Sequence, residues 1–358
     1  MQQHLTKPDL ENLIQAEDLA ETNVEEILRF FRQDERLQDK LPNGMFAVDP
    51  RTGDRVLFNP ARARRPHDVG KPEPPISKDR EDCPICGGDT TGVIDVAELS
   101  EGFTFINKNL FPVLYPFEDE PARGLHLLQW TSNYHHRDWH NLPVPDCIIV
   151  MSQLAALEQK WIRDGQMLSS ELRSEPYISI IKNAGAEVGA SLSHGHQQIA
   201  VGNVMPRRIQ DHLNFKEHHA QHFSQWMLDR LTPELIIRDF GSAVLAVPHF
   251  MKRPYDMLLL MRASDKSYLF ELEESELEAA AEGWHLATGL IQEIMPHIDK
   301  EPAYNILVHN GPGAGLYFEF KPHTQITGGY EQIGLHICQG SPEVAAADLR
   351  ATAERLLS

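Results

Sequence analysis

Two histidines separated by one glycine, His194 and His196, close a glycine-containing stretch that spans residues 183–198. The apolar, β-branched residues on both sides predict a strand, a tight loop, and then a short strand that carries both histidines. Because residues two apart in a strand share a face, His194, His196 and Gln198 are expected to project together. Backbone N–H groups of such a loop bind phosphate oxygens, and a neutral imidazole attacks phosphorus. The stretch therefore predicts transfer of a phosphoryl or nucleotidyl group through a histidine intermediate.

The elements that would position this loop occur twice in the chain. The order of strands and a long helix in the first half recurs in the second half, where residues 304–313 resemble residues 177–185. We interpret this as an internal duplication of an α+β unit, joined by a helical linker near residues 206–232. The second copy has Tyr317 and Glu319 where the first has the two histidines. Strands are predicted at 103–107, 125–130, 177–182, 244–247, 255–261, 304–308 and 316–320, and the long helices at 145–166 and 274–295.

Composition narrows the class of protein. The 358 residues are 41% hydrophobic, which is typical of a globular protein with one large or two ordinary domains. The net charge of −19 argues against non-specific nucleic-acid binding, although a few arginines suffice for one small phosphorylated ligand. No apolar run is long enough to span a membrane, and the N-terminal residues lack the pattern of a secretory signal. We therefore expect a cytoplasmic protein.

Four cysteines are too few for a disulfide scaffold, and Cys83 and Cys86 have the spacing C-x-x-C. A redox pair and two inert thiols are the alternatives to a metal site. Two sulfur and two nitrogen ligands form the tetrahedral set that Zn²⁺ prefers, and histidines lie downstream to complete it.

A compact basic segment, residues 60–66, carries Arg62, Arg64 and Arg65 between two prolines. A solvated basic patch is the ordinary explanation for such a segment. The guanidinium group also suits bidentate contacts with phosphate, so the segment is a candidate phosphate contact.

Residues 183–198, with Gly-Ala-Ser-Leu-Ser-His-Gly-His-Gln-Gln, resemble the active-site signature of the galactose-1-phosphate uridylyltransferase family, a branch of the histidine-triad superfamily. The resemblance is closer still to the ADP-glucose phosphorylase-like nucleotidyltransferases. Four more segments are similar to the family in the same order, so that the resemblance covers roughly residues 45 to 355: they are 49–66, 83–86, 107–114 and 329–331.

The resemblance implies a role for each matching residue. His196 is the nucleophile that becomes nucleotidylated, and Gln198 bonds the transferred phosphoryl group. Arg62 and Arg65 lie near the phosphates of the nucleotide, and Asn107 contacts the nucleotide. The diphosphate is held by a loop that contains Asn183, Gly189 and Ser191.

The resemblance also implies a zinc ion that is held by Cys83, Cys86 and His194. The fourth ligand lies in a loop after a strand, where His135, His136 and His140 are candidates. The spacing of His140 to the next helix suits the family best, so His140 is selected. The zinc would be structural and would fix His194, thereby aiming His196.

The expected fold is α+β, with two fused histidine-triad-like units that each contain an antiparallel sheet and a long helix. The expected segments are an N-terminal helical extension (1–44), a unit with the zinc and the nucleophile (45–205), a helical linker (206–234) and a degenerate second unit (235–358). The resemblance implies a nucleotidyltransferase, with a ping-pong exchange between a nucleotide sugar and a phosphate or sugar phosphate. A homodimer is expected.

Two other functions remain open. At Gln325 the uridylyltransferases proper have a lysine, which favours a phosphorylase or hydrolase of nucleotide sugars or dinucleoside polyphosphates on the same scaffold. The degenerate second half also allows a catalytically silent, zinc-stabilised nucleotide-binding protein. The nucleotide base and the sugar have no signature in the sequence.

Overall fold

The structure is a computed structural model that describes residues 4–10, 13–16, 19, 22–48, 55–57, 61, 83–163, 176–263 and 265–358. The chain forms two compact units. Unit 1 comprises residues 1–138, 149–180 and 191–214, and unit 2 comprises residues 139–148, 181–190 and 215–358. The α+β prediction is confirmed, because helices accompany an antiparallel sheet of ten strands, β3 to β12.

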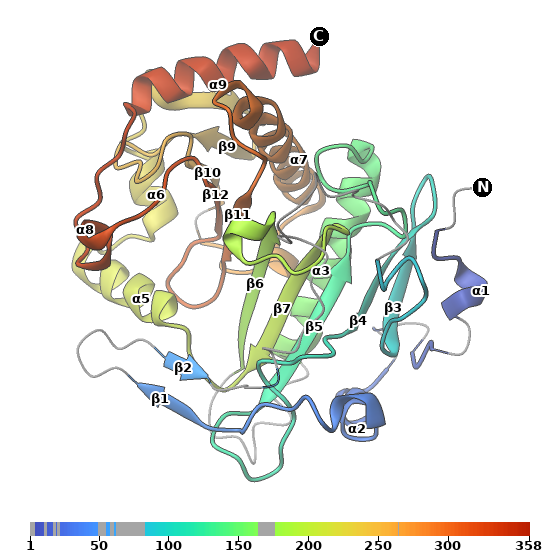
Figure 1. Cartoon of the computed structure of the whole chain (residues 1–358). Coiled ribbons are helices and arrows are strands. Elements are labelled where there is room, and N and C mark those ends of the chain that lie inside the picture. Colours follow the sequence, from blue (N-terminus) through green and yellow to red (C-terminus); the bar gives the residue numbers. More distant parts are fainter. Residues whose placement is uncertain are drawn as a thin grey trace. The chain divides into compact units, whose positions relative to one another are not determined.

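Unit 1 contains the strands that carry the predicted site, and Figure 1 shows them side by side in the order β3, β4, β5, β7. Tyr177–Ile180, the first half of β6, follows β7 in this order. Strands β4 and β5 match predicted strands, whereas β3 was not predicted. The strand predicted to carry both histidines is β7, but it begins at His196, so His194 precedes it and its ring faces Cys83 and Cys86 instead. The bounds are β3 Val93–Glu98, β4 Phe103–Lys108, β5 Gly124–Trp130, β6 Tyr177–Ala184 and β7 His196–Gly202. Outside this sheet, β1 (Phe46–Val48) pairs with β2 (Arg55–Leu57) in an antiparallel manner.

Side chains alternate along each strand, so the two faces of the sheet of unit 1 carry different residues. One face packs against helix α3 (Val144–Arg163), whose Gln153 accepts a hydrogen bond from Gln129 of β5 at 2.7 Å. Gln197 of β7 joins this network by donating to Gln129 at 2.8 Å. The opposite face carries Trp130, which follows Gln129 along β5, and His196, which precedes Gln197 along β7. Helix α3 therefore supports the sheet from behind the predicted site.

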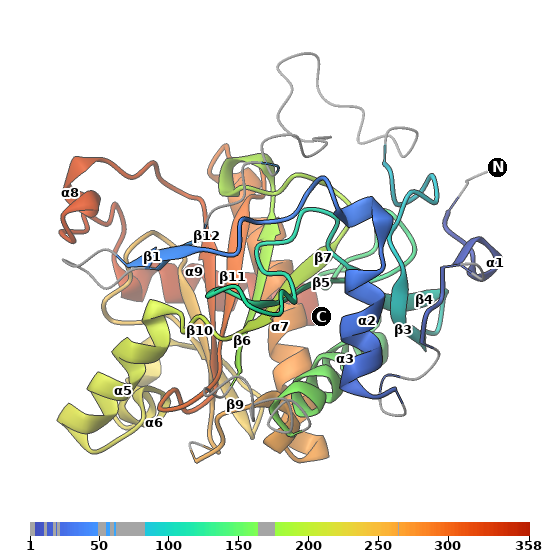
Figure 2. The ribbon, with the colours of Figure 1, turned by 90° about the horizontal axis from the view of Figure 1, so that it is seen from below.

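The N-terminal segment packs onto this unit rather than standing apart from it. Helix α2 (Val24–Arg32) begins at Asn23, whose side chain accepts a hydrogen bond from the Glu26 N–H, a typical N-cap. Figure 2 shows α2 beside β3 and β4. Lys108 at the end of β4 donates to the Phe30 carbonyl oxygen at 3.0 Å. The other short elements of this segment are α1 (Lys7–Leu10) and the 3₁₀ helix η1 (Glu35–Leu37).

Unit 2 has a sheet with the strand order β6-β11-β12-β10-β9-β8, to which β6 contributes Ile181–Ala184. Helix α7 packs against β9, β10 and β12, and Gly283 of this helix leaves room for the side chain of Leu259. Helix α9 was not predicted; it packs against α7 and β8. The bounds are β8 Ile236–Asp239, β9 Ala243–Ala246, β10 Met257–Met261, α7 Glu274–His297, β11 Tyr304–His309, β12 Tyr317–Pro322, α8 Gly329–Gln332 and α9 Pro342–Leu357.

The remaining helices are α5 (Arg207–His219) and α6 (Phe223–Leu228), which form the helical region predicted near 206–232, and the 3₁₀ helices η4 (Ala186–Val188), η5 (Pro233–Leu235) and η6 (Leu269–Glu271). Within the described ranges, none of the helices combines the length and the apolar character that crossing a bilayer requires.

Candidate active site and metal centre

His196 is the first residue of β7 and lies directly opposite Trp130 of β5. The preceding turn is held closely, because the Thr131 N–H donates to the Gly195 carbonyl oxygen at 3.0 Å. A Cβ on Gly195 would lie 2.6 Å from Cγ of Asp138, so only glycine allows the turn to approach this side chain. The sequence therefore fixes where β7 begins and which face His196 occupies.

The imidazole of His196 is nearly buried, with 6% of its residue surface exposed. Its Nδ1 atom lies 2.8 Å from the carbonyl oxygen of His194. A carbonyl oxygen only accepts, so Nδ1 carries the hydrogen and Nε2 carries the lone pair. A neutral imidazole in this tautomer is the form that acts as a nucleophile through Nε2.

The face of the His196 ring lies against Trp130, with 4.8 Å between the ring centroids and 38° between the planes. The indole N–H of Trp130 donates to Oδ1 of Asn107 at 3.0 Å. The Asn107 amide in turn donates to the hydroxyls of Thr90 at 2.5 Å and Thr91 at 3.0 Å. All of these residues are buried, so the indole is fixed by a chain of hydrogen bonds.

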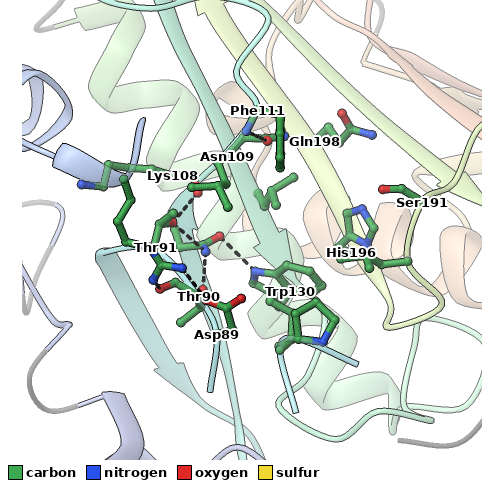
Figure 3. A pocket seen from close by; sticks show the side chains of 17 residues that line it. Asp89, Thr90, Thr91, Lys108, Asn109, Phe111, Trp130, Ser191, His196 and Gln198 are labelled. Carbon is green, nitrogen blue, oxygen red and sulfur yellow. Dashed lines mark hydrogen bonds and ion pairs between the residues drawn. The ribbon is translucent and has the colours of Figure 1, made fainter. Parts of the chain in front are cut away.

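A pocket opens beside His196, entirely within unit 1 (Figure 3). His196, Ser191 and Gln198 lie on one side of it, and Asp89, Thr90 and Lys108 lie on the other, with Trp130 between them. Four residues of the predicted site, Asn107, Ser191, His196 and Gln198, line this pocket. Apolar walls come from Pro84, Ile85, Leu110, Phe111, Leu128 and Leu192. An apolar pocket with a few converging polar groups is typical of a small-molecule site.

The N-terminal segment supplies two residues next to this pocket. Arg36 lines the pocket, donates to the Thr90 carbonyl oxygen at 2.6 Å and pairs with the Asp89 carboxylate. Lys108 is fully buried and pairs with the Asp34 carboxylate. Burial lowers the pKa of the Lys108 ammonium, which the neighbouring Asp34 opposes. The pocket wall thus includes Arg36 of the segment that was predicted to be an extension.

Four potential metal ligands gather behind the His194 turn: one atom each from Cys83, Cys86, His135 and His194, all within 4.8 Å of one another. Sγ of Cys86 lies 3.4 Å from Nδ1 of His135 and 3.6 Å from Nδ1 of His194, and Sγ of Cys83 lies 3.7 Å from the latter. The group contains His135 and not His140, so the choice of His140 as the fourth ligand is corrected. The prediction of His140 relied on spacing along the chain. The loop turns at residues 134–137, where the Arg137 N–H donates to the Tyr134 carbonyl oxygen, and spacing does not show such a turn.

The donor set fits a zinc ion. Tetrahedral bonds of about 2.3 Å to sulfur and about 2.1 Å to nitrogen give separations of roughly 3.4 to 3.8 Å between ligand atoms, close to those found here. His194 Nε2 lies 2.8 Å from the Ser132 carbonyl oxygen, to which it donates, and this leaves Nδ1 as the coordinating nitrogen. The Cys86 thiol and burial raise the pKa of the Cys83 thiol, whereas both imidazoles lower it. Coordination of a cation would stabilise the thiolate that zinc requires.

Comparison with known proteins shows which proteins the chain resembles. No family model matches the chain. It is 24% identical over 276 residues to a galactose-1-phosphate uridylyltransferase of Thermotoga maritima, which covers 74% of this chain and 80% of that protein. It is 23% identical over 328 residues to an ADP-glucose phosphorylase of Arabidopsis thaliana, covering 84% of this chain and 91% of that protein. The resemblance to the galactose-1-phosphate uridylyltransferase family is confirmed.

Solved structures show the same fold. A uridylyltransferase structure matches with a TM-score of 0.66 and 20% identity, and covers 89% of this chain and all of that chain. The structure of an Arabidopsis thaliana ADP-glucose phosphorylase with bound ADP-glucose matches with a TM-score of 0.60 and 19% identity, and covers 87% of this chain and 99% of that chain.

Among the described residues that the family resemblance implies, Asn183 and Gly189 do not line the pocket. Arg62 and Arg65 lie outside the described residues. Asn183 and Gly189 belong to unit 2, where the Asn183 side chain accepts a hydrogen bond from Asn305 at 2.8 Å. Gly189 adopts a left-handed conformation with φ of 86°, which explains a glycine at the end of η4.

The segment that was predicted to be a second copy of the motif lies in unit 2 and carries charged side chains. Glu319 lies on β12, where its carboxylate is 3.0 Å from Nε2 of His309 and 2.9 Å from Nζ of Lys321. Burial alone would raise the pKa of Glu319, but its hydrogen bond with His309 and the Lys321 charge hold that pKa well below its usual value. Tyr317 stacks on His309 with 4.2 Å between ring centroids. This copy has a carboxylate where unit 1 has its nucleophile candidate.

Sequence reasoning missed four parts of the site: Trp130, the Thr90 and Thr91 hydroxyls, Lys108 and Arg36. Strand alternation could have placed Trp130 on the face of His196 once the two strands were known to be neighbours. Nothing in the local sequence indicated that Arg36 would reach the pocket.

Proposed function

We propose that the protein is a nucleotidyltransferase that moves a nucleoside monophosphate between a nucleotide sugar and a phosphate or sugar-phosphate acceptor through a covalent intermediate on His196. The observation that carries this proposal is the hydrogen bond from His196 Nδ1 to the His194 carbonyl oxygen, beside a pocket. It leaves the Nε2 lone pair as the nucleophile. The relatives named as galactose-1-phosphate uridylyltransferase and ADP-glucose phosphorylase support the same class of reaction.

The reaction has two displacements at the α-phosphorus. In the first, the Nε2 lone pair forms the bond to phosphorus while the bond to the bridging oxygen breaks, and the sugar phosphate leaves with that electron pair. The proton stays on Nδ1, held by the His194 carbonyl oxygen. In the second, an oxygen of the acceptor phosphate attacks the same phosphorus and the Nε2 bond breaks. One site thus serves two acceptors in turn.

The polar groups beside His196 are suited to the charge that develops on the phosphoryl oxygens. Gln198 projects from the same face of β7, and the Ser191 side chain lines the same pocket. Donors that are already positioned stabilise such charge without reorganisation. We assign Gln198 to the transferred phosphoryl group, and Asn183, Gly189, Arg62 and Arg65 to the diphosphate, as the resemblance implies.

A Zn²⁺ ion would be held by Cys83, Cys86, His135 and His194. When bound, it supplies structure rather than a reacting group, because four protein ligands leave no open coordination position. By fixing His194, it fixes the carbonyl oxygen that holds His196.

A phosphorylase is the second candidate, favoured by Gln325. Its side chain donates to the Ile337 carbonyl oxygen at 2.9 Å and accepts from the Gln339 N–H at 3.1 Å, so its amide is engaged within its own segment. Because the lysine of the uridylyltransferases proper is missing at this position, phosphate is the acceptor that we assign to this candidate. Product analysis decides: nucleoside diphosphate formed from phosphate shows a phosphorylase, and a new nucleotide sugar formed from hexose 1-phosphate shows a transferase. Hydrolysis would release the nucleoside monophosphate, from a nucleotide sugar or a dinucleoside polyphosphate.

Isotope exchange tests the covalent route. A two-step mechanism predicts that a nucleotide sugar exchanges label with its own sugar phosphate when no other acceptor is present. His196→Asn should abolish the exchange, and His218→Asn, which changes an exposed histidine of unit 2, should leave it intact. Tight nucleotide binding with no exchange in the wild-type protein would instead favour a silent binding protein. ADP-, UDP- and GDP-sugars should be compared, because the base is not assigned.

The proposal also includes a cytoplasmic homodimer with no nucleic-acid or membrane partner. Light scattering of the purified protein tests the oligomeric state, and a mass equal to that of one chain would exclude the homodimer.

A further inference from the structure

Trp130 touches both histidines of the His194 turn. Its ring centroid lies 4.8 Å from that of His196 and 5.3 Å from that of His194, and the second contact is edge-on at 83°. Trp130 is fully buried and stands directly opposite His196 in the β5–β7 register. Directly opposed residues of neighbouring antiparallel strands are in closest contact on a shared face. The indole is thus the surface against which the imidazole rests.

The amide of Asn107 is occupied in holding this indole. Both of its amide hydrogens are donated, to the hydroxyls of Thr90 and Thr91, and its oxygen accepts from the Trp130 N–H. An asparagine amide has only two hydrogens to donate, and this one is 2% exposed. It has no donor left for a nucleotide. Asn107 therefore holds the indole through its amide oxygen, while the two threonines hold its amide nitrogen.

We propose that Trp130, anchored by Asn107, is a positioning residue that holds the imidazole of His196 by its face and stabilises the charge that the ring acquires. The proposal rests on the proposed function, since it concerns the same nucleophile. A hydrogen bond at Nδ1 constrains the position of that atom more than the tilt of the ring. The indole face removes this freedom, and the bond to Asn107 prevents the indole from moving with it.

The charge follows from the chemistry of the adduct. When Nε2 forms its bond to phosphorus, Nδ1 still carries a hydrogen, so the ring has the positive charge of an imidazolium. An indole face attracts such a cation through its quadrupole, and the attraction is stronger when water is excluded. The same ring therefore aims the nucleophile and lowers the energy of the nucleotidylated state.

Kinetics with paired variants tests this role. Trp130→Phe and Asn107→Leu each remove the hydrogen bond between residues 130 and 107. Each should lower kcat by about tenfold or more while KM changes little. Because both act through one contact, the double variant should lose no more than the worse single variant. Trp284→Phe is the matched control: Trp284 is equally buried, and among the described residues its indole N–H has no hydrogen-bond partner. Equal losses in kcat for Trp130→Phe and Trp284→Phe would overturn the inference.

A measurement without turnover separates this inference from the proposed function. Nitrogen-15 resonances of the histidine rings, assigned by comparison with His196→Asn, should show a narrow Nδ1–H signal for His196 in the wild-type protein and a signal broadened by ring motion in Trp130→Phe. Identical His196 resonances in the two proteins would overturn the positioning role, whether or not the protein reacts. If the wild-type protein forms no adduct, the proposed function is wrong, but the nitrogen-15 comparison still decides whether Trp130 positions the ring of His196.

Discussion

The Nδ1 atom of His196 lies 2.8 Å from the carbonyl oxygen of His194, so the residue proposed to react and the residue proposed to bind metal share one hydrogen bond. The side chain of His194 turns towards Cys83 and Cys86, whereas its backbone oxygen faces the other histidine. Binding of a metal by His194 would therefore be coupled to the orientation of the His196 ring through the carbonyl group of His194.

The metal group is tested by removing ligands one at a time. His135→Gln and Cys86→Ser should lower the zinc content from about one ion per chain to near none, because a site with three ligands binds far more weakly. His140→Gln should keep the metal, since His140 is outside the group. Elemental analysis of the purified proteins measures this. Loss of zinc in His140→Gln with retention in His135→Gln would reverse the assignment made here.

Chelation should reduce the transferase activity without removing any reacting group. Because the ion fixes His194 and thereby the carbonyl oxygen that holds His196, the loss should appear in kcat and be restored by added Zn²⁺. Assays before and after treatment with a strong chelator, with zinc content measured in parallel, provide the check. Full activity at zero metal would mean that the turn is rigid without the ion.

The turn itself is tested by adding one methyl group. Gly195→Ala would place a Cβ 2.6 Å from Cγ of Asp138, whose carboxylate is held by Thr131 at 3.0 Å. The turn must shift, and a displacement near 1 Å lowers the rate by about a hundredfold. The control is Gly289→Ala in helix α7, where the nearest atom is at 3.6 Å and stability should rise slightly. Initial rates measure the effect, and equal rates for both variants would contradict the account.

The buried pair of Lys108 and Asp34 should contribute strongly to stability. Asp34→Asn leaves an ammonium group without its countercharge in a site with no exposed surface, and should lower the free energy of unfolding by about 3 kcal/mol. Glu35→Gln makes the same change of charge at an exposed neighbour and should alter stability by less than about 0.5 kcal/mol. Denaturant unfolding compares the two. Similar losses would show that the N-terminal segment does not pack as described.

A carboxyl group of unit 2 should make stability depend on pH. Burial raises the pKa of Asp256 to about 6, and the nearby Glu319 adds to this, against the charges of Lys321 and Arg253. The native state then holds the proton more tightly than the unfolded chain, so the free energy of unfolding falls as pH rises from about 4 to about 6.

Asp256→Asn removes that titration and should flatten the dependence by up to about 1.4 kcal/mol per pH unit. Denaturant unfolding at intervals from pH 4 to pH 7 gives the two curves. Parallel curves for the wild-type protein and the variant would show that Asp256 titrates normally.

The sequence predicted the site wherever the information was local. Alternation along β7 put His196 and Gln198 on one face, and C-x-x-C marked half of the metal group. The register of β5 against β7 brings Trp130 opposite His196, and it depends on which strands become neighbours. The fourth ligand depended on the direction of a loop, so chain spacing favoured His140 over His135. Arg36 reaches the pocket across 54 residues of sequence to Thr90, and no local pattern carries that contact.

The fold was predictable in the same way. Long apolar periodicities gave β4, β5, β6, β10, β11, α3 and α7 to within a few residues. Strand β3 was missed because acidic residues interrupt its apolar run at Asp95. Helix α9 was missed although Ser341 caps it and Pro342 begins it, a start signal that the sequence analysis did not use.

The most direct test of the central claim is to trap the nucleotidylated protein. The protein is mixed with a nucleotide sugar labelled in the α-phosphate, quenched within a single turnover, and mapped by peptide mass spectrometry under alkaline conditions that preserve phosphoramidates. The account predicts one nucleoside monophosphate on His196, absent from His196→Asn and released by the acceptor phosphate. Steady turnover with no label on the protein, or label on a different residue, would contradict it.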